Sequence, residues 1–412
     1  MKSFALALLS AWLALPVAAQ TVDAKSRVDI NTFTASDANR QLTICLVPDI
    51  QNMVSSSDFD AEGGASNCAV TTGYCTGSSC TASPWCSVSW RNTGEILLRN
   101  MAYSLTGQWT SIDYSAIDGT DTVRSKRPHP LDHGPCDLIA GLGDNLDTAN
   151  LREYNELTAD MLHQYAMAKM FWTIIRDSGI PFIIARGNHE GEGTFEQLLA
   201  DLGVSGLSFY HDGDADGEQY AVTFPTRIGK NFCALTLDDD IESDTGDEYT
   251  AGEKAWILAT AGCGSALPTI LIGHIIVGTT GALGVYATDI TGNAAGDPIF
   301  IVAGGHYTPG LPISVKTSTT NLAAKTVFTF FSNWQEWNRH NTNVGGNGIS
   351  TSDGIGGAYT VIQIDANSSR FCAHDWNPYH QSRSSKGGTQ DNGATELYSS
   401  ECVDFDFDAR FP

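Results

Sequence analysis

Short apolar runs recur along this chain, and each of them begins or ends beside a glycine or a proline. Runs of this length are typical of strands that are covered on both faces. We therefore predict buried strands at residues 42–47, 137–142, 181–185, 269–272 and 298–303. Residues 220–224 and 232–237 predict two further strands that pair with each other.

A different spacing predicts two helices. Apolar residues recur every three or four positions from Leu157 to Ile175, and Gly179 follows them as a stop signal. A second helix is expected to open at Thr250, because Glu253 three residues later completes a capping box ahead of an apolar run. Strands and helices that alternate in this way indicate an α/β fold in which helices flank the sheets.

The first 19 residues differ from the rest of the chain. They combine one positive charge, a short apolar stretch and small residues, as a secretory signal peptide does, and we expect cleavage after Ala19. A membrane anchor is the alternative, but spanning a bilayer takes about 20 apolar residues. We therefore expect a secreted protein, extracellular or periplasmic, with no membrane span and with a single domain over residues 20–412.

Ten cysteines fit an oxidising compartment. Four of them lie in a Gly/Ser/Thr-rich insertion at about residues 54–90, namely Cys68, Cys75, Cys80 and Cys86. We expect two disulfides within this loop, with three pairings open, because thiols in an exported chain more often oxidise than bind zinc. An irregular tail begins at about residue 381, and the alternation from Val403 to Asp408 predicts one last half-buried strand.

The net charge of the chain limits the classes of molecule that it can bind. Lys and Arg number 23 against 47 Asp and Glu, which gives a formal net charge of −24. So acidic a surface repels a polyanion, which argues against nucleic acid as the main partner and against a nuclease.

Metal-ligand residue types follow five of the predicted strands. They are Asp49 and Gln51, Asp144, Asn188 and His189, His274, and His306. Loops after the carboxyl ends of strands converge on one edge of an α/β sheet, which is where ligands bind. Glycines precede most of these residues and let the backbone pass close to a bound ion. A single Gly-Asp or Gly-His is most often a turn, but the ordered set predicts a metal site.

The same residues form a series of motifs. Asp49-Ile50-Gln51, Gly143-Asp144-Asn145, Gly187-Asn188-His189-Glu190, Gly273-His274 and Gly305-His306 follow the order D-x-H, G-D, G-N-H-E/D, a separate His and G-H-x-H. The chain thereby resembles the calcineurin-like metallophosphoesterase superfamily, in particular secreted members whose first motif reads D-x-Q. The resemblance implies a β-sandwich flanked by helices, with two metal ions at the carboxyl ends of its strands.

The resemblance also assigns roles. Asp144 would bridge the two ions, one site would be completed by Asn188, His274 and His306, and the other would include Asp49 and Gln51. His189 would face the leaving group of a phosphate ester instead of a metal. Asp147 stands where some family members place the carboxylate that orients this histidine.

Two positions depart from the family pattern. Gln51 replaces the usual histidine of the first motif, and Thr308 replaces the last histidine, so that both changes fall on the same metal site. His340 and His380 are candidate substitutes. We expect one tightly held transition-metal ion, such as zinc, iron or manganese, and a weaker second ion, such as magnesium, calcium or manganese.

The sequence thus predicts a secreted metal-dependent hydrolase that cleaves small phosphate mono- or diesters with an activated water. The alternative is a binding or structural protein on the same scaffold, with one metal retained and little activity. Two lesser signals stand apart from this site. Residues 212–217 resemble the start of a calcium loop but lack its closing Glu, which favours an acidic turn, and Asn367-Ser368-Ser369 is a glycosylation acceptor where the source glycosylates.

Overall fold

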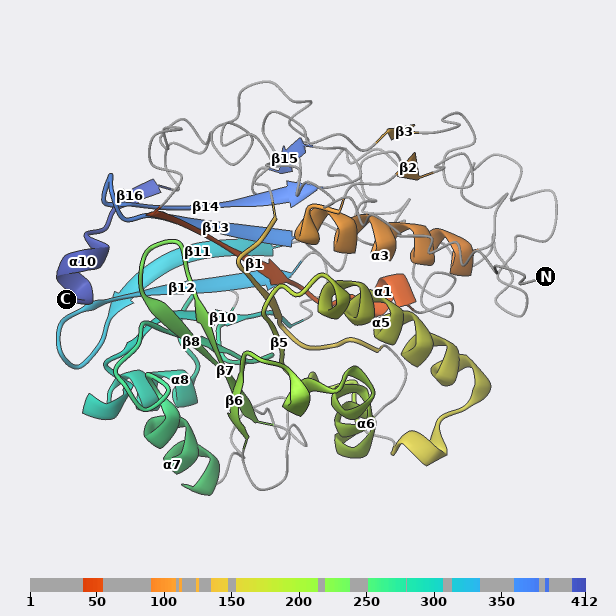
Figure 1. The fold of residues 1–412 in the computed structure, drawn as a ribbon. Coiled ribbons are helices and arrows are strands. Elements are labelled where there is room, and N and C mark those ends of the chain that lie inside the picture. Colours follow the sequence, from red (N-terminus) through yellow and green to blue (C-terminus); the bar gives the residue numbers. More distant parts are fainter. Residues whose placement is uncertain are drawn as a thin grey trace, which may run out of the picture.

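The computed structural model has a mixed α/β architecture in which two seven-stranded mixed sheets carry helices on their outer faces (Figure 1). It describes residues 40–54, 90–108, 111–112, 124–125, 135–146, 153–213, 219–237, 251–278, 280–306, 313–333, 359–377, 382–384 and 402–412. Within this part of the chain, no helix is long and apolar enough to cross a membrane.

The first sheet is built around the parallel strands β1, β4 and β5. Its order is β15 (Ser382–Ser384), β14 (Arg370–Asn377), β13 (Tyr359–Asp365), β1 (Gln41–Val47), β4 (Leu138–Gly141) and β5 (Phe182–Ile184), and β16 (Cys402–Asp404) also pairs with β14. β13 runs antiparallel to β1, and β14 runs antiparallel to β13. The carboxyl ends of β1, β4 and β5 therefore share one edge of this sheet.

The second sheet is built around the parallel strands β8, β9, β10 and β12. Its order is β11 (Ile313–Thr320), β12 (Thr326–Asn333), β10 (Ile299–Gly304), β9 (Thr269–Ile272), β8 (Asn231–Thr236), β7 (Tyr220–Pro225) and β6 (Tyr210–Gly213). A separate two-stranded ribbon is formed by β2 (Ser111–Ile112) and β3 (Arg124–Ser125).

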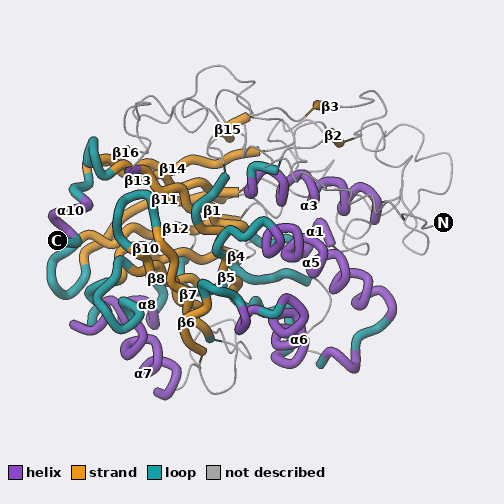
Figure 2. The backbone as a smooth tube through the Cα atoms, in the orientation of Figure 1, coloured by secondary structure: helices purple, strands orange, loops and turns teal. Residues whose placement is uncertain are grey.

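Helices occupy both flanks of the molecule. They are α1 (Gln51–Val54), α3 (Trp90–Thr106), α5 (Ala159–Asp177), α6 (Glu192–Leu202), α7 (Ala251–Thr260), α8 (Val285–Thr291) and α10 (Phe407–Arg410), with 3-10 turns at η6 (Tyr154–Glu156), η7 (Val204–Gly206) and η8 (Ala294–Gly296). Figure 2 shows α7 and α8 on one flank and α3, α5 and α6 grouped on the other.

The central strands β9 and β10 of the second sheet are buried along their whole length because both of their faces are covered. On β9, Ile270 and Ile272 belong to the large core that both sheets share, whereas Leu271 points into a smaller core. That smaller core contains Ile257 of α7 and Ile290 of α8. Successive side chains of a strand point to opposite faces, so β9 contributes to both apolar cores.

The predicted elements are confirmed, with shifts of one or two residues at most of their ends. All five buried strands are present as β1, β4, β5, β9 and β10, and β7 pairs antiparallel with β8. The long predicted helix is α5, which begins after Thr158, whose side chain accepts a hydrogen bond from the Met161 backbone N–H. The second predicted helix is α7.

Three disulfides hold the described part of the chain. They are Cys45–Cys136, Cys233–Cys263 and Cys372–Cys402. None of them was predicted, because a bridge between distant residues depends on tertiary register. The four cysteines of the insertion and the predicted signal peptide lie outside the described residues.

The prediction of a last strand through Asp408 was wrong in part. β16 ends at Asp404, and α10 follows after Asp406, whose side chain caps the Ala409 backbone N–H. Phe405 and Phe407 are both buried, but a turn and a short helix place them there, so alternation alone could not define the element. The segment closes one end of the shared core with an aromatic cluster.

Phe407 is the centre of this aromatic cluster. It is fully buried, its ring stacks on Phe232 with centroids 5.6 Å apart, and it contacts Phe300 and Phe411 edge-on or tilted. We predict that Phe407→Ala lowers the free energy of unfolding by about 3–5 kcal/mol, because it leaves a cavity in a packed core. Denaturant unfolding measures this loss. Val403→Ala, at a half-exposed position of the same segment, is the control and should cost much less; equal losses would contradict the cluster's role.

Candidate metal centre

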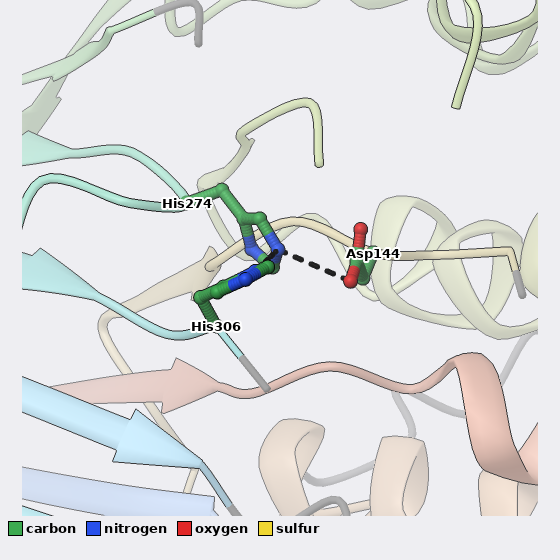
Figure 3. A group of neighbouring side chains, drawn as sticks. All are labelled: Asp144, His274 and His306. Atoms are coloured by element: carbon green, nitrogen blue, oxygen red, sulfur yellow. Dashed lines mark hydrogen bonds and ion pairs between the residues drawn. The ribbon is translucent and has the colours of Figure 1, made fainter. Parts of the chain in front are cut away.

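Five strand ends from the two sheets deliver the residues of this centre. β1, β4 and β5 lead to Asp49, Asp144 and Asn188, while β9 and β10 lead to His274 and His306. Figure 3 shows the two imidazoles approaching from one side and the carboxylate of Asp144 from the other. The centre therefore forms where the edges of the two sheets meet.

The Nε2 atom of His274 lies close to a donor atom from each of three other side chains. It is 3.0 Å from Asn188 Oδ1, 3.0 Å from His306 Nδ1 and 3.1 Å from Asp144 Oδ2. One donor atom each from Asp144, His274 and His306 can be chosen so that all lie within 4.8 Å of one another. A tetrahedral ion with bonds of about 2.0–2.1 Å separates its ligands by about 3.3 Å. The three distances from His274 Nε2 are thus close to the spacing that a single ion requires.

The backbone orients His274 for this role. Its Nδ1 is 2.8 Å from the carbonyl oxygen of Leu142, so an Nδ1–H donated to that carbonyl leaves Nε2 toward the other donors. Gly143 makes this contact possible, because a Cβ there would lie 2.6 Å from Nδ1 of His274. His274 is completely buried, which fixes its ring between the two sheets.

Asp144 is held in an unusual backbone conformation. Its φ is 47°, a left-handed value that costs free energy in a residue with a side chain and recurs at functional sites. Its Oδ1 accepts a hydrogen bond of 3.1 Å from the backbone N–H of His189. Gly187 packs directly on it, since a Cβ at Gly187 would lie 2.1 Å from Asp144 Oδ1.

Glu190 ties the two ligand loops of the first sheet together. Its carboxylate accepts hydrogen bonds from the backbone N–H of Leu146, at 2.6 Å, and of Gly187, at 2.8 Å. The side chain is fully buried, and burial followed by repulsion from Asp144 raises its pKa to about 7. Sequence reasoning gave this residue no role, although its place directly after Asn188-His189 was the available signal.

A second group of oxygens lies beside this centre. Asp49 is fully buried, and neither of its carboxylate oxygens accepts a hydrogen bond in the described structure. Gln51 Oε1 likewise accepts no hydrogen bond, and the Gln51 backbone N–H donates to the Asp144 carbonyl at 3.1 Å. Buried oxygens without donors are costly unless a cation offsets them, and this donor set suits a hard ion.

The charges of the centre are coupled. Burial raises the pKa of Asp49 well above its usual range. Burial also acts to raise the pKa of Asp144. The positive charge of His274 and the hydrogen bond between His274 and Asp144 have the opposite effect and outweigh burial, so the pKa of Asp144 is lowered. Burial would lower the pKa of His274, yet Asp144 and Asp49 raise it to about 10. The direction of this shift favours an imidazolium ion at His274 when no metal is bound.

The remaining predicted residues are placed less completely. His189 is half-buried, and it is not among the three residues whose donor atoms gather. Asp147, its predicted partner, lies outside the described residues, as do Thr308, His340 and His380.

Comparison with known proteins assigns no relative. The chain matches no protein-family model and no curated protein. The geometry of the site residues is therefore the basis for assigning a chemistry to this centre.

The contact between Gly187 and Asp144 yields a first test of the centre. We predict that Gly187→Ala weakens transition-metal binding by roughly 10–100-fold, because the new methyl group must displace the Asp144 backbone and carboxylate. Competition with a chromogenic chelator measures the affinity. Gly206→Ala is the matched control, since a Cβ there meets nothing within 4 Å. Unchanged affinity in Gly187→Ala would show that Asp144 is not a ligand in this position.

The protonation of His274 yields a second test. A metal ion must replace the proton on Nε2, so we predict that binding releases about one proton and that affinity rises about tenfold per pH unit below the pKa of about 10. The rise should level off above that pKa, where His274 is already neutral. Calorimetry in two buffers with different ionisation enthalpies counts the released protons. An affinity that did not change between pH 6.5 and pH 8 would contradict the charged state of His274.

Proposed function

We propose that this chain is a secreted metal-dependent phosphoesterase that hydrolyses small phosphate mono- or diesters. The observation that carries the proposal is the gathering of Asp144, Asn188, His274 and His306 around one point at the shared edge of two sheets. Each residue comes from the end of a different strand, as ligand-binding residues of α/β proteins do. The order of these residues also matches the motifs of the calcineurin-like metallophosphoesterases.

The donor set favours a transition metal at this point. Two imidazoles, one carboxylate and one amide oxygen suit zinc, iron or manganese. When bound, the cations supply Lewis-acid chemistry, which activates a water and offsets the charge of the phosphoryl oxygens. Phosphate esters need this help because their own charge repels nucleophiles.

A second ion would take the neighbouring oxygens. Asp49 and Gln51, with a share of Asp144, would form a shell that is rich in oxygens. Such a shell prefers magnesium, calcium or manganese, which keep several waters and exchange readily. We therefore propose an uneven pair, with one ion held tightly and one held weakly.

His189 is proposed to act on the substrate. Its backbone N–H binds Asp144, which fixes the residue beside the centre while its imidazole is not needed as a ligand. A histidine in this place can donate a proton to the leaving oxygen of an ester or stabilise its charge. Asp147 would orient the ring, as the family motif implies.

The acidic surface and the exported state fit this proposal. A net charge of −24 disfavours nucleic acid, so we propose a small phosphate ester as substrate. Three disulfides are compatible with an oxidising exterior.

The test is a phosphoester panel with metal-depleted and metal-restored protein. We expect chelation to abolish hydrolysis, a transition metal together with millimolar magnesium or manganese to restore it, and elemental analysis to find about one tightly bound transition metal per chain. His306→Ala should lose this metal. His189→Ala should keep it while turnover falls by about 10²–10⁴-fold.

The panel also separates the alternatives. Two zinc ions that survive chelator dialysis would contradict the uneven pair and would point to a further ligand such as His340. One bound metal without hydrolysis under any ion would favour a binding protein on this scaffold. Gln51 motivates this alternative, because its amide replaces the imidazole that the family pattern places in the second metal site. Metal loss in His189→Ala would show that His189 is a ligand.

A further inference from the structure

A chain of buried polar side chains connects the two sheets near the metal centre. Lys316 on β11 donates to Asp375 Oδ2 on β14 at 2.7 Å, and Thr360 on β13 donates to Asp375 Oδ1 at 2.6 Å. Ser332 on β12 completes the chain through a 2.9 Å contact between its hydroxyl and that of Thr360. Two residues thus come from each sheet.

The hydrogen bonds of this chain have a defined direction. An ionised carboxylate only accepts, so Thr360 must give its one hydroxyl proton to Asp375. Ser332 must then donate to the Thr360 oxygen. The order is therefore Ser332 to Thr360 to Asp375, with Lys316 donating from the other end. Changing any one member alters the partners of the next.

All four side chains of this hydrogen-bonded series are buried, so removing their polar and charged groups from water costs free energy. The side chain of Asp375 is 1% exposed and that of Lys316 is 8% exposed, while Ser332 and Thr360 are inaccessible. A buried ion pair is a poor source of stability, because well-packed apolar residues of similar size often serve as well or better. The buried ion pair between Lys316 and Asp375 is therefore better explained by a need to fix the relative positions of the two sheets than by stability.

Ser332 joins this polar chain to the metal centre. Its carbonyl oxygen lies against Gly305, where a Cβ would be only 2.5 Å from that oxygen. Gly305 directly precedes His306, and its backbone N–H donates to the His274 carbonyl at 3.0 Å. Gly305 therefore lies between the backbones of Ser332 and His274, directly before His306.

We propose that Lys316, Asp375, Thr360 and Ser332 form a positioning network that sets the spacing between His306 and His274. The network acts through the backbone of Ser332 and Gly305. The proposal rests on the metal centre described above, but not on the identity of the reaction that it performs.

The test compares metal affinity with stability in variants of Thr360. Thr360→Val keeps the shape but removes the hydroxyl that both Ser332 and Asp375 use, so we expect cobalt or zinc binding to weaken by roughly 10–100-fold, as for other outer-shell groups. Thr360→Ser keeps the hydroxyl and should restore binding. The visible spectrum of bound Co²⁺ should shift in Thr360→Val and return in Thr360→Ser.

Thr269 provides the matched control. It is a buried threonine at the start of β9, at the opposite end of the strand from His274, and its hydroxyl bonds the backbone of Gly262 and Leu267. Thr269→Val should lose stability but bind metal as the unaltered protein does. Equal weakening in both valine variants, or unaltered binding and spectrum in Thr360→Val, would overturn the proposal.

Two further variants keep the test decisive. Ser332→Ala breaks the same chain with a smaller change and replaces Thr360→Val if that variant does not fold; it too should weaken binding, and unaltered affinity would overturn the proposal. His306→Ala tests the centre itself. If His306→Ala left metal binding intact, the metal centre would fail, and the network would fail with it; if His306→Ala lost the metal while the network variants kept it, only the network proposal would fail.

Discussion

The contact between Asp144 and His274 is the constraint on which the rest of the centre depends. One residue belongs to a loop of the first sheet and the other to a loop of the second, and their charged atoms lie 3.1 Å apart in complete burial. Such an approach requires Gly143 and Gly187, where any side chain would collide with one of the two residues. It also requires the left-handed backbone of Asp144. The apolar core that both sheets share holds them close enough for this contact to form.

Much of this arrangement could be predicted from local pattern. Runs such as residues 269–272 identify buried strands because both faces need apolar side chains, and the residue types after them indicate the candidate ligands. The helix at Ala159–Asp177 follows from its periodicity and its Gly179 stop. The end of the chain was harder, because alternating Phe405 and Phe407 fits a strand as well as a turn followed by a short helix.

Other features could not be predicted because they depend on neighbours across the fold. Cys372 pairs with Cys402 only once β16 lies beside β14, and no spacing rule selects that partner. Glu190 was visible as part of a motif, but its two backbone donors come together only when the loops after β4 and β5 meet. Lys316 and Asp375 are single charged residues in strands of opposite sheets. The sequence of neither strand predicts that the two side chains form an ion pair.

The Cys45–Cys136 disulfide has a consequence for the long segment that it encloses. It joins β1 to the residue just ahead of β4, and these two strands lead to Asp49 and Asp144. The 91-residue separation contains the entire cysteine-rich insertion. A covalent tie at the base makes the two carboxylates independent of the length and content of that insertion, since loop closure no longer adds to the cost of bringing the strands together. The pairing of β1 with β4 therefore tolerates the long segment that separates the two strands in sequence.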